Sequence, residues 1–83
     1  MHIDQLVNIL AIAQYRSLSL AAEKLFLSKQ SLSESVMNLE NEFHIKIFER
    51  SHKGMTATPL GKEFLADADK LLTAYQQMLA KFA

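Results

Sequence analysis

The chain has 83 residues, of which 49% are hydrophobic and 22% charged, as is ordinary for one small folded domain. It contains no cysteine, which excludes disulfides, thiolate metal sites and thiol catalysis. Its three histidines, His2, His44 and His52, share no ligand spacing, so we expect no metal ion. Because a core of this size is marginal by itself, we expect a partner chain to add stability.

The formal net charge is zero, so the whole chain lacks the basic balance typical of nucleic-acid binding. The charge is uneven, however, and residues 44–62 are the one net-positive stretch. This stretch contains four cations and one carboxylate: Lys46, Arg50, Lys53 and Lys62, and Glu49. No apolar run approaches the ~20 residues of a membrane span, and the N-terminus has no signal-peptide pattern. We therefore expect a cytoplasmic protein with no membrane partner.

Apolar residues at helical spacing predict two helices in the first third of the chain. The first begins at Ile3 and ends near Tyr15, and its apolar stripe is formed by Ile3, Leu6, Leu10 and Ala13. Ser19 is the predicted N-cap of the second helix, since Glu23 supplies a carboxylate in its first turn. This helix is barely two turns long and presents a small apolar face: Ala21, Ala22 and Leu25.

Ser28 is the predicted N-cap of a third helix, with Ser31 three residues on. A stripe spaced by four, three and four residues is expected in the core: Leu32, Val36, Leu39 and Phe43. The outer face is unusual, because its first half carries uncharged hydrogen-bonding groups rather than the Lys and Glu of an ordinary solvent face. We expect the helix to stop near His44.

Residues 45–58 predict a β-hairpin, in which Ile45–Arg50 and Met55–Thr58 pair across a basic turn at Ser51–Gly54. A hairpin of two strands is barely stable alone, so it must pack on the helices. Thr58 followed by Pro59 is a strong start for a fourth helix, which we expect to run towards Ala83.

The fourth helix has an apolar stripe about 24 residues long, or roughly 36 Å, which is more than a three-helix core can cover. We therefore expect it to pair two copies of the chain, although a core helix lying across its own domain is an alternative. The expected dimer contacts are Leu60, Phe64, Leu65, Ala68, Leu71, Leu72, Tyr75, Met78, Leu79 and Phe82.

Nothing in the sequence predicts catalysis or a cofactor. Gly54 and Gly61 are too far apart for a phosphate-binding loop, and the serines of the third helix have no nearby base. The remaining order is helix, short helix, four-residue turn, helix and basic hairpin. That order is typical of a winged helix-turn-helix that binds DNA.

In such a domain the first residues of the third helix meet the base edges. Gln30 can pair with adenine through two hydrogen bonds, and Ser31 or Ser33 can bond to bases or phosphates. The free amides of the helix start suit a phosphate near Ser28 and Lys29.

The cations of the hairpin, Arg50 and Lys53, can reach flanking phosphates or the minor groove. Simpler roles stay open for these residues. Ser33 can bond back to its own helix, Arg50 can pair with Glu49 or Glu42, and Lys53 can be a plain surface charge.

Five segments also occur in the order and spacing of a known family: Ser17–Leu25, Leu32–Ser33, Asn38–Glu40, Phe48–Arg50 and Thr58–Gly61. Through them the chain resembles the N-terminal DNA-binding domain of LysR-type bacterial transcriptional regulators. The resemblance implies a mainly α fold: a winged helix-turn-helix over residues 1–58, with three helices and a two-stranded β-hairpin wing, then a long dimerising linker helix over 59–83. It also implies a homodimer on double-stranded operator DNA. Any small-molecule effector would bind a further domain, which this chain lacks.

By that resemblance, the positions matching DNA contacts are Ser28, Lys29, Gln30, Ser31, Ser33 and Glu34 on the helix, and Arg50 and Lys53 on the wing. The family commonly has arginine in place of Glu34, proline or a small residue in place of Gln30, and glycine in place of His44. A carboxylate at position 34 loses a phosphate contact and can instead accept a hydrogen bond from cytosine N4. His44 has to adopt a left-handed backbone at some cost.

A second class of function stays open. The chain can be a helical dimerisation or protein-interaction module whose winged helix does not bind DNA. Zero net charge and Glu34 favour that alternative, whereas the uncharged outer face of the third helix and the positive hairpin favour DNA.

Overall fold

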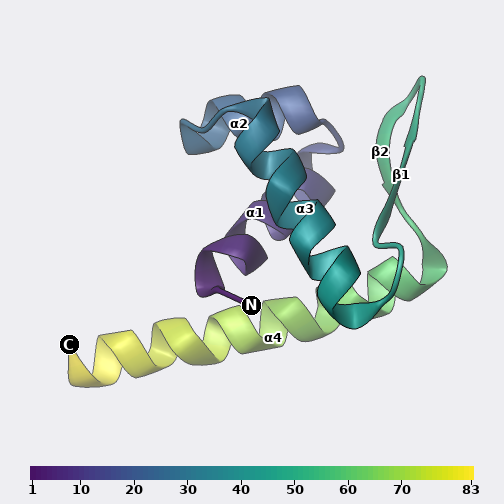
Figure 1. Cartoon of the computed structure of the whole chain (residues 1–83). Coiled ribbons are helices and arrows are strands. Elements are labelled where there is room, and N and C mark those ends of the chain that lie inside the picture. Colours follow the sequence, from purple (N-terminus) through teal and green to yellow (C-terminus); the bar gives the residue numbers. More distant parts are fainter.

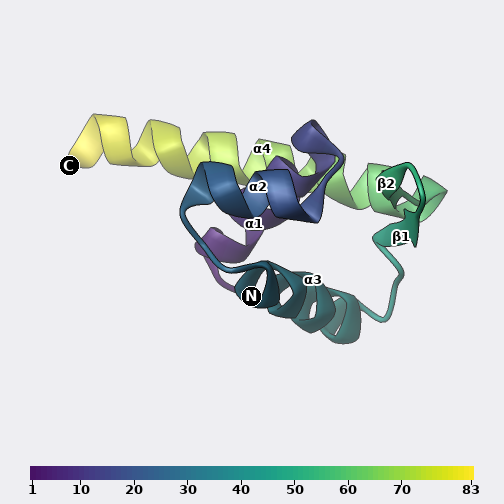
Figure 2. The same cartoon turned by 90° about the horizontal axis from the view of Figure 1, so that it is seen from above.

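The computed structural model describes all residues 1–83 and has four helices and one antiparallel hairpin (Figure 1). In chain order the elements are α1 (Ile3–Tyr15), α2 (Leu18–Leu25), α3 (Lys29–Phe43), β1 (Phe48–Ser51), β2 (Gly54–Ala57) and α4 (Pro59–Phe82). Seen from above, α3 and α4 run on opposite sides of α2, and the hairpin stands between the end of α3 and the start of α4 (Figure 2). The predicted winged helix-turn-helix with a long final helix is confirmed.

The core lies where α1 meets α3 and the first half of α4. Its fully buried large side chains are Leu6, Ile9, Ile12, Leu32, Leu39 and Ile47. A buried hydrogen bond of 2.9 Å from Asn8 Nδ2 to Ser35 Oγ joins α1 to α3 and satisfies both polar groups. The predicted stripe of α3 is buried at Leu32, Val36 and Leu39, but that of α1 is buried only at Leu6; Ile9 and Ile12 complete the buried face of α1, and Ile3, Leu10 and Ala13 are half-buried beside it.

The start of α2 differs from the prediction. Ser17, not Ser19, is the N-cap: its Oγ accepts a 3.0 Å hydrogen bond from the amide of Leu20. The reason is the left-handed turn at Arg16, with φ 54°, which ends α1 and leaves Ser17 in the extended conformation that an N-cap requires. Ser19 already lies inside the helix and is exposed.

Both ends of α3 agree with the prediction. The Ser28 hydroxyl accepts a 3.0 Å hydrogen bond from the amide of Ser31, and His44 ends the helix in the left-handed conformation, with φ 55°. The predicted burial of Phe43 is wrong, because its side chain is 41% exposed. It lies in the last turn of α3, where its ring meets the edge of Phe64 from α4, 4.9 Å between centroids, and leaves one side to solvent.

The hairpin is shorter than predicted. β1 pairs with β2 in the register Phe48↔Ala57 and Arg50↔Met55, joined by a turn at His52 and Lys53. Residues 45–47 form no strand, because their backbone groups bond elsewhere. The carboxylate of Glu40 accepts hydrogen bonds from the amides of Ile47 (2.7 Å) and Phe48 (3.3 Å), and the Ile47 carbonyl accepts one from Thr58.

The hairpin also packs against the end of α1. The amide of Met55 donates a 3.1 Å hydrogen bond to the carbonyl of Arg16, and Gly54 has a φ of +104° directly against that carbonyl. A side chain at Gly54 would be strained and would overlap Arg16. The hairpin is therefore held at two places: α1 contacts it at Gly54 and Met55, next to the turn, and Glu40 of α3 holds its base at Ile47 and Phe48.

The helix α4 begins as predicted, with the Thr58 hydroxyl accepting a 2.8 Å hydrogen bond from the amide of Gly61 and Pro59 in the first turn. Gly61 lies so close to the Ile47 carbonyl that a Cβ would overlap it. Leu65 and Ala68 are 9% and 2% exposed, because they belong to the core of this same domain. They were expected at the dimer contact and are not available for it.

Beyond Ala68, α4 leaves the core, and its free end extends past the other helices (Figure 1). Five of its large apolar side chains there are open to solvent, whereas Leu72 is half-buried: Leu71 (51%), Tyr75 (39%), Met78 (60%), Leu79 (46%) and Phe82 (76%). The prediction that the stripe is longer than the core can cover is confirmed. No helix has the length and apolar content needed to cross a membrane.

Candidate nucleic-acid interface

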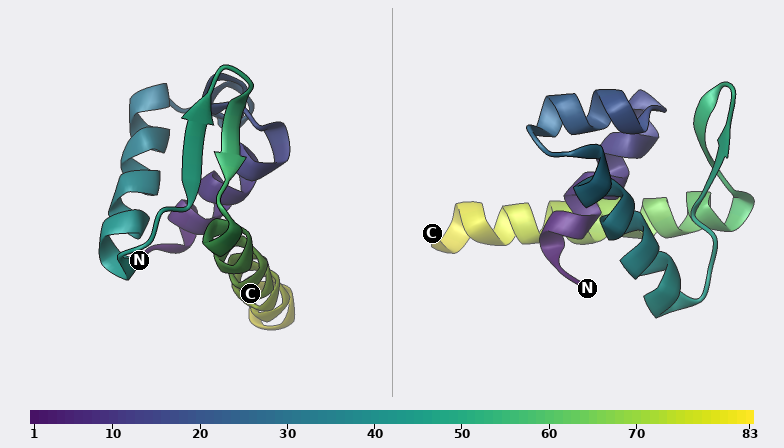
Figure 3. Two further views of the ribbon diagram at one scale, coloured as in Figure 1. Left: turned by 90° about the vertical axis from the view of Figure 1, so that its right-hand side faces the viewer. Right: turned by 45° about the horizontal axis from the view of Figure 1, so that its top comes forward.

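The start of α3 presents a polar, exposed surface beside the hairpin. Figure 3 shows α3 and the hairpin side by side, with β1 nearer to α3 than β2. Of the predicted contact residues on α3, Ser33 is half-buried and lines a hollow together with Phe48 and Arg50 of the hairpin. The others are exposed: Ser28, Lys29, Gln30, Ser31 and Glu34.

Two hollows separate α3 from the hairpin, and Arg50 lines both. One, of about 320 Å³, brings Ser33 of α3 to Lys46 and Arg50. The other, of about 290 Å³, lies where the starts of α2 and α3 meet the hairpin, and brings Lys29 to Arg50 and Ser19. Glu40 also lines the first hollow, but its Oε2 is held by the amides of Ile47 and Phe48. The surface between α3 and the hairpin is therefore mainly cationic.

The predicted residues Ser33, Lys29 and Arg50 are thus brought together, whereas Lys53 lies at the hairpin tip and lines a different hollow. Lys46 also lies in the site, although the sequence pattern does not assign it there. Its signal was its place in the positive stretch 44–62, but sequence position alone does not direct it towards α3.

The helix starts add partial positive charge to this surface. α2 and α3 both begin here, and the unpaired amides of a helix N-terminus favour an anion such as phosphate. At α3 the Ser28 hydroxyl has used its proton, because it accepts from the Ser31 amide and donates to the Ser31 Oγ at 2.9 Å, and it keeps one acceptor lone pair. The Ser31 hydroxyl keeps its own proton for an outside acceptor.

Gln30 and Glu34 are coupled on the outer face of α3. The Gln30 Nε2 lies 3.5 Å from the Glu34 Oε1, one helical turn away, which makes a long hydrogen bond. The carboxylate therefore orients the side-chain amide of Gln30 and leaves its carbonyl oxygen free. A base that pairs with Gln30 meets a negative charge beside it.

Arg50 has no carboxylate partner. The single ion pair of the chain joins the N-terminal amino group to Glu42 at 3.1 Å, so the alternative pairing of Arg50 with Glu42 or Glu49 is not observed. Across the hairpin Arg50 lies opposite Met55. No hydrogen bond returns the Ser33 hydroxyl to its own helix either. Both side chains keep their donors for an outside partner.

Comparison with known proteins identifies the family to which the chain is similar. Residues 3–62 match the family model of the bacterial regulatory helix-turn-helix proteins of the lysR family. The regulator CysL of Bacillus subtilis is 35% identical over 81 residues, which are 98% of this chain and 27% of that protein. BenM of Acinetobacter baylyi is 34% identical over 80 residues, 96% of this chain and 26% of that protein. The chain thus spans about a quarter of the length of these relatives.

Solved structures agree in fold. The BenM DNA-binding domain in complex with catB site 1 DNA superposes with a TM-score of 0.92 at 33% identity, over 98% of this chain and 91% of that one. The CbnR domain in its DNA complex also has a TM-score of 0.92, at 28% identity over 98% of this chain and 93% of that one. On these grounds the chain belongs to the LysR family of bacterial regulatory helix-turn-helix proteins.

Proposed function

We propose that this domain binds operator DNA as a homodimer and regulates transcription in the bacterial cytoplasm, with α3 in the major groove and the hairpin on the flanking backbone. The observation that carries the proposal is the convergence of Ser33, Lys29 and Arg50 between the start of α3 and the hairpin, with no ion pair to neutralise the cations. The DNA complexes of the similar BenM and CbnR domains support it.

The proposal gives each part of the chain a role. Residues 1–58 contact DNA and residues 59–83 pair the two copies. The proposed DNA contacts are Ser28, Lys29, Gln30, Ser31, Ser33, Glu34, Arg50 and Lys53, together with Lys46. The relatives are named as transcriptional regulators, and the proposed role has no catalytic step or cofactor. A small-molecule effector would act through the part of such a regulator that this domain does not include.

The direct test is selection from a randomised duplex pool at two salt concentrations. We expect enrichment of a two-fold-related site, with an affinity that falls steeply as salt rises, because released counterions dominate phosphate binding. Flat, weak binding without enrichment would favour the alternative, a protein-interaction module that does not bind DNA.

Gln30→Ala is expected to weaken binding to the selected site by about 1–3 kcal/mol and to relax the preference at one base pair, because it removes a base contact. Gln14→Ala is the matched control, since Gln14 is an exposed glutamine on α1. Equal affinities of the two variants for the selected duplex would remove Gln30 from the set of base contacts.

Glu34→Arg is expected to strengthen binding to any duplex and to steepen its salt dependence by about one unit of the log–log slope per domain, because a cation replaces a carboxylate beside the backbone. Asp69→Arg makes the same change of charge on the outer part of α4, where Asp69 is exposed. If both variants change the slope equally, Glu34 acts through net charge alone and lies away from the phosphates.

A further inference from the structure

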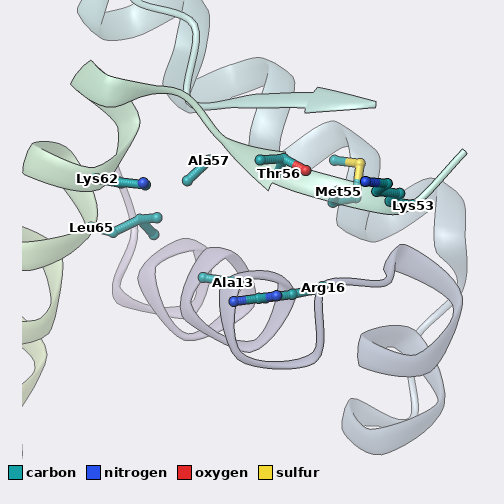
Figure 4. A pocket seen from close by; sticks show the side chains of 8 residues that line it. All are labelled: Ala13, Arg16, Lys53, Met55, Thr56, Ala57, Lys62 and Leu65. Carbon is teal, nitrogen blue, oxygen red and sulfur yellow. The ribbon is translucent and has the colours of Figure 1, made fainter. Parts of the chain in front are cut away.

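The side of the hairpin that faces away from α3 holds a third hollow, of about 450 Å³. It lies between the end of α1, strand β2 and the first turns of α4 (Figure 4). Ala13, Ala57 and Leu65 form its apolar floor. Arg16, Lys53 and Lys62 supply its charge.

These three cations come from the end of α1, the hairpin turn and the first turn of α4, and all three are exposed. In Figure 4 the Arg16 and Lys62 side chains extend along the opening between α1 and α4. No carboxylate lines the hollow, and none of the three cations takes part in an ion pair. Cations placed close together around a concave surface repel one another, and an anion bound between them offsets that repulsion.

We propose that this hollow receives a backbone phosphate of the bound duplex, outside the segment contacted by α3. The inference rests on the proposed function. Lys53 stands at the tip of the hairpin and lines this hollow, so it continues the cationic surface of Arg50 and Lys46 around the hairpin. The duplex would then contact both sides of the hairpin.

The geometry favours a phosphate of DNA over a free ion. Exposed, flexible Lys and Arg side chains around an open, partly apolar hollow hold a lone anion weakly, because water competes for every contact. A duplex already bound at α3 presents its phosphates to the hollow at a high effective concentration. Weak individual contacts then add to affinity and to salt dependence.

The test uses the selected duplex and the double variant Arg16→Gln/Lys62→Gln. Single phosphates of the duplex are replaced in turn by neutral methylphosphonates, and the loss of affinity is recorded at each position. We expect the double variant to lose its sensitivity to replacement of one phosphate, at a position where the Arg50→Gln variant keeps its sensitivity. Its salt slope should fall by about one unit per domain, since each neutralised phosphate contributes about 0.9.

Two control variants separate this contact from other effects. Lys70→Gln/Lys81→Gln removes the same charge from exposed positions on the outer part of α4 and should keep the full methylphosphonate profile. Arg16→Lys/Lys62→Arg keeps both charges and should keep it as well. Because Arg16 and Lys62 are exposed, thermal unfolding should be unchanged in the variants.

Three results would overturn the proposal. A double variant with the unaltered profile and salt slope would refute the hollow as a phosphate site while leaving the proposed function intact. Absence of duplex binding by the unaltered domain would refute both. Tight binding of inorganic phosphate at constant ionic strength, lost in the double variant, would assign the hollow to a free anion instead of DNA.

Discussion

The double variant Leu71→Asp/Met78→Asp is expected to convert the domain from a dimer to a monomer. Both side chains lie on the part of α4 beyond the core, and they are 51% and 60% exposed. In a dimer through this face they would be buried, where unpaired carboxylates are strongly unfavourable. Sedimentation at micromolar concentrations measures the change of mass directly.

The loss of the dimer should appear in DNA binding. Affinity for a duplex with two half-sites is expected to fall at least about 100-fold, because the second half-site is no longer bound within the same complex. Affinity for a single half-site should stay the same, since α3 and the hairpin are untouched. The winged helix should also keep its thermal stability, because neither residue belongs to the core.

The control for this variant is Thr73→Asp/Ala80→Asp. Thr73 and Ala80 are also exposed and seven residues apart, but they lie about 200° around the helix axis from Leu71 and Met78. This control adds the same two charges and should stay dimeric. A monomeric unaltered domain, or two variants that dissociate alike, would contradict the proposed interface on the apolar face of α4.

The second large effect is expected for Glu40→Ala, which should loosen the hairpin from α3. The Glu40 carboxylate is the acceptor for the amides of Ile47 and Phe48, two residues that are 0% and 3% exposed. Removing it leaves two donors in a buried segment without a partner. We expect the free energy of unfolding to fall by about 2–3 kcal/mol in a denaturant titration.

The effect on DNA distinguishes a positioning role of Glu40 from a purely stabilising one. If Glu40 sets the place of the hairpin beside α3, the variants Glu40→Ala and Arg50→Ala should be non-additive in a double-mutant cycle of DNA affinity. Glu40→Gln keeps one acceptor oxygen and should recover part of both losses. Glu42→Ala is the control, since Glu42 is exposed and bonds only to the chain terminus. Additive effects of Glu40 and Arg50 would exclude the positioning role.

Elements whose signals are local follow from the sequence alone. Ser28 and Thr58 cap helices through amides three residues away, and the apolar stripe of α4 is readable from its spacing. The excess length of that stripe over the core is also a property of the sequence. Local hydrogen bonds and helical periodicity connect residues within about one turn, so their outcome does not depend on distant parts of the chain.

Tertiary structure decided the features that join residues far apart in the sequence. Ser17 rather than Ser19 caps α2 because a left-handed turn at Arg16 ends α1 there, and the Arg16 carbonyl accepts a hydrogen bond from Met55 of β2. The sequence pattern indicates an ordinary acidic residue on the helix surface at Glu40. In the structure, the loop before β1 packs on this residue, and its carboxylate accepts a hydrogen bond from the Ile47 amide. Leu65 and Leu71 belong to one stripe in the sequence, yet the first is in the core and the second in solvent.

The charge distribution follows the same division. The sequence contains a positive stretch over residues 44–62, but its cations separate onto two sides of the hairpin in the fold. Lys46 and Arg50 face α3, and Lys62 faces α1, where it meets Arg16. Only Arg50 of these residues lies in a strand. Lys46 precedes β1 and Lys62 lies on α4, so their positions depend on how the loop before β1 and the start of α4 pack against the hairpin, which no local pattern encodes.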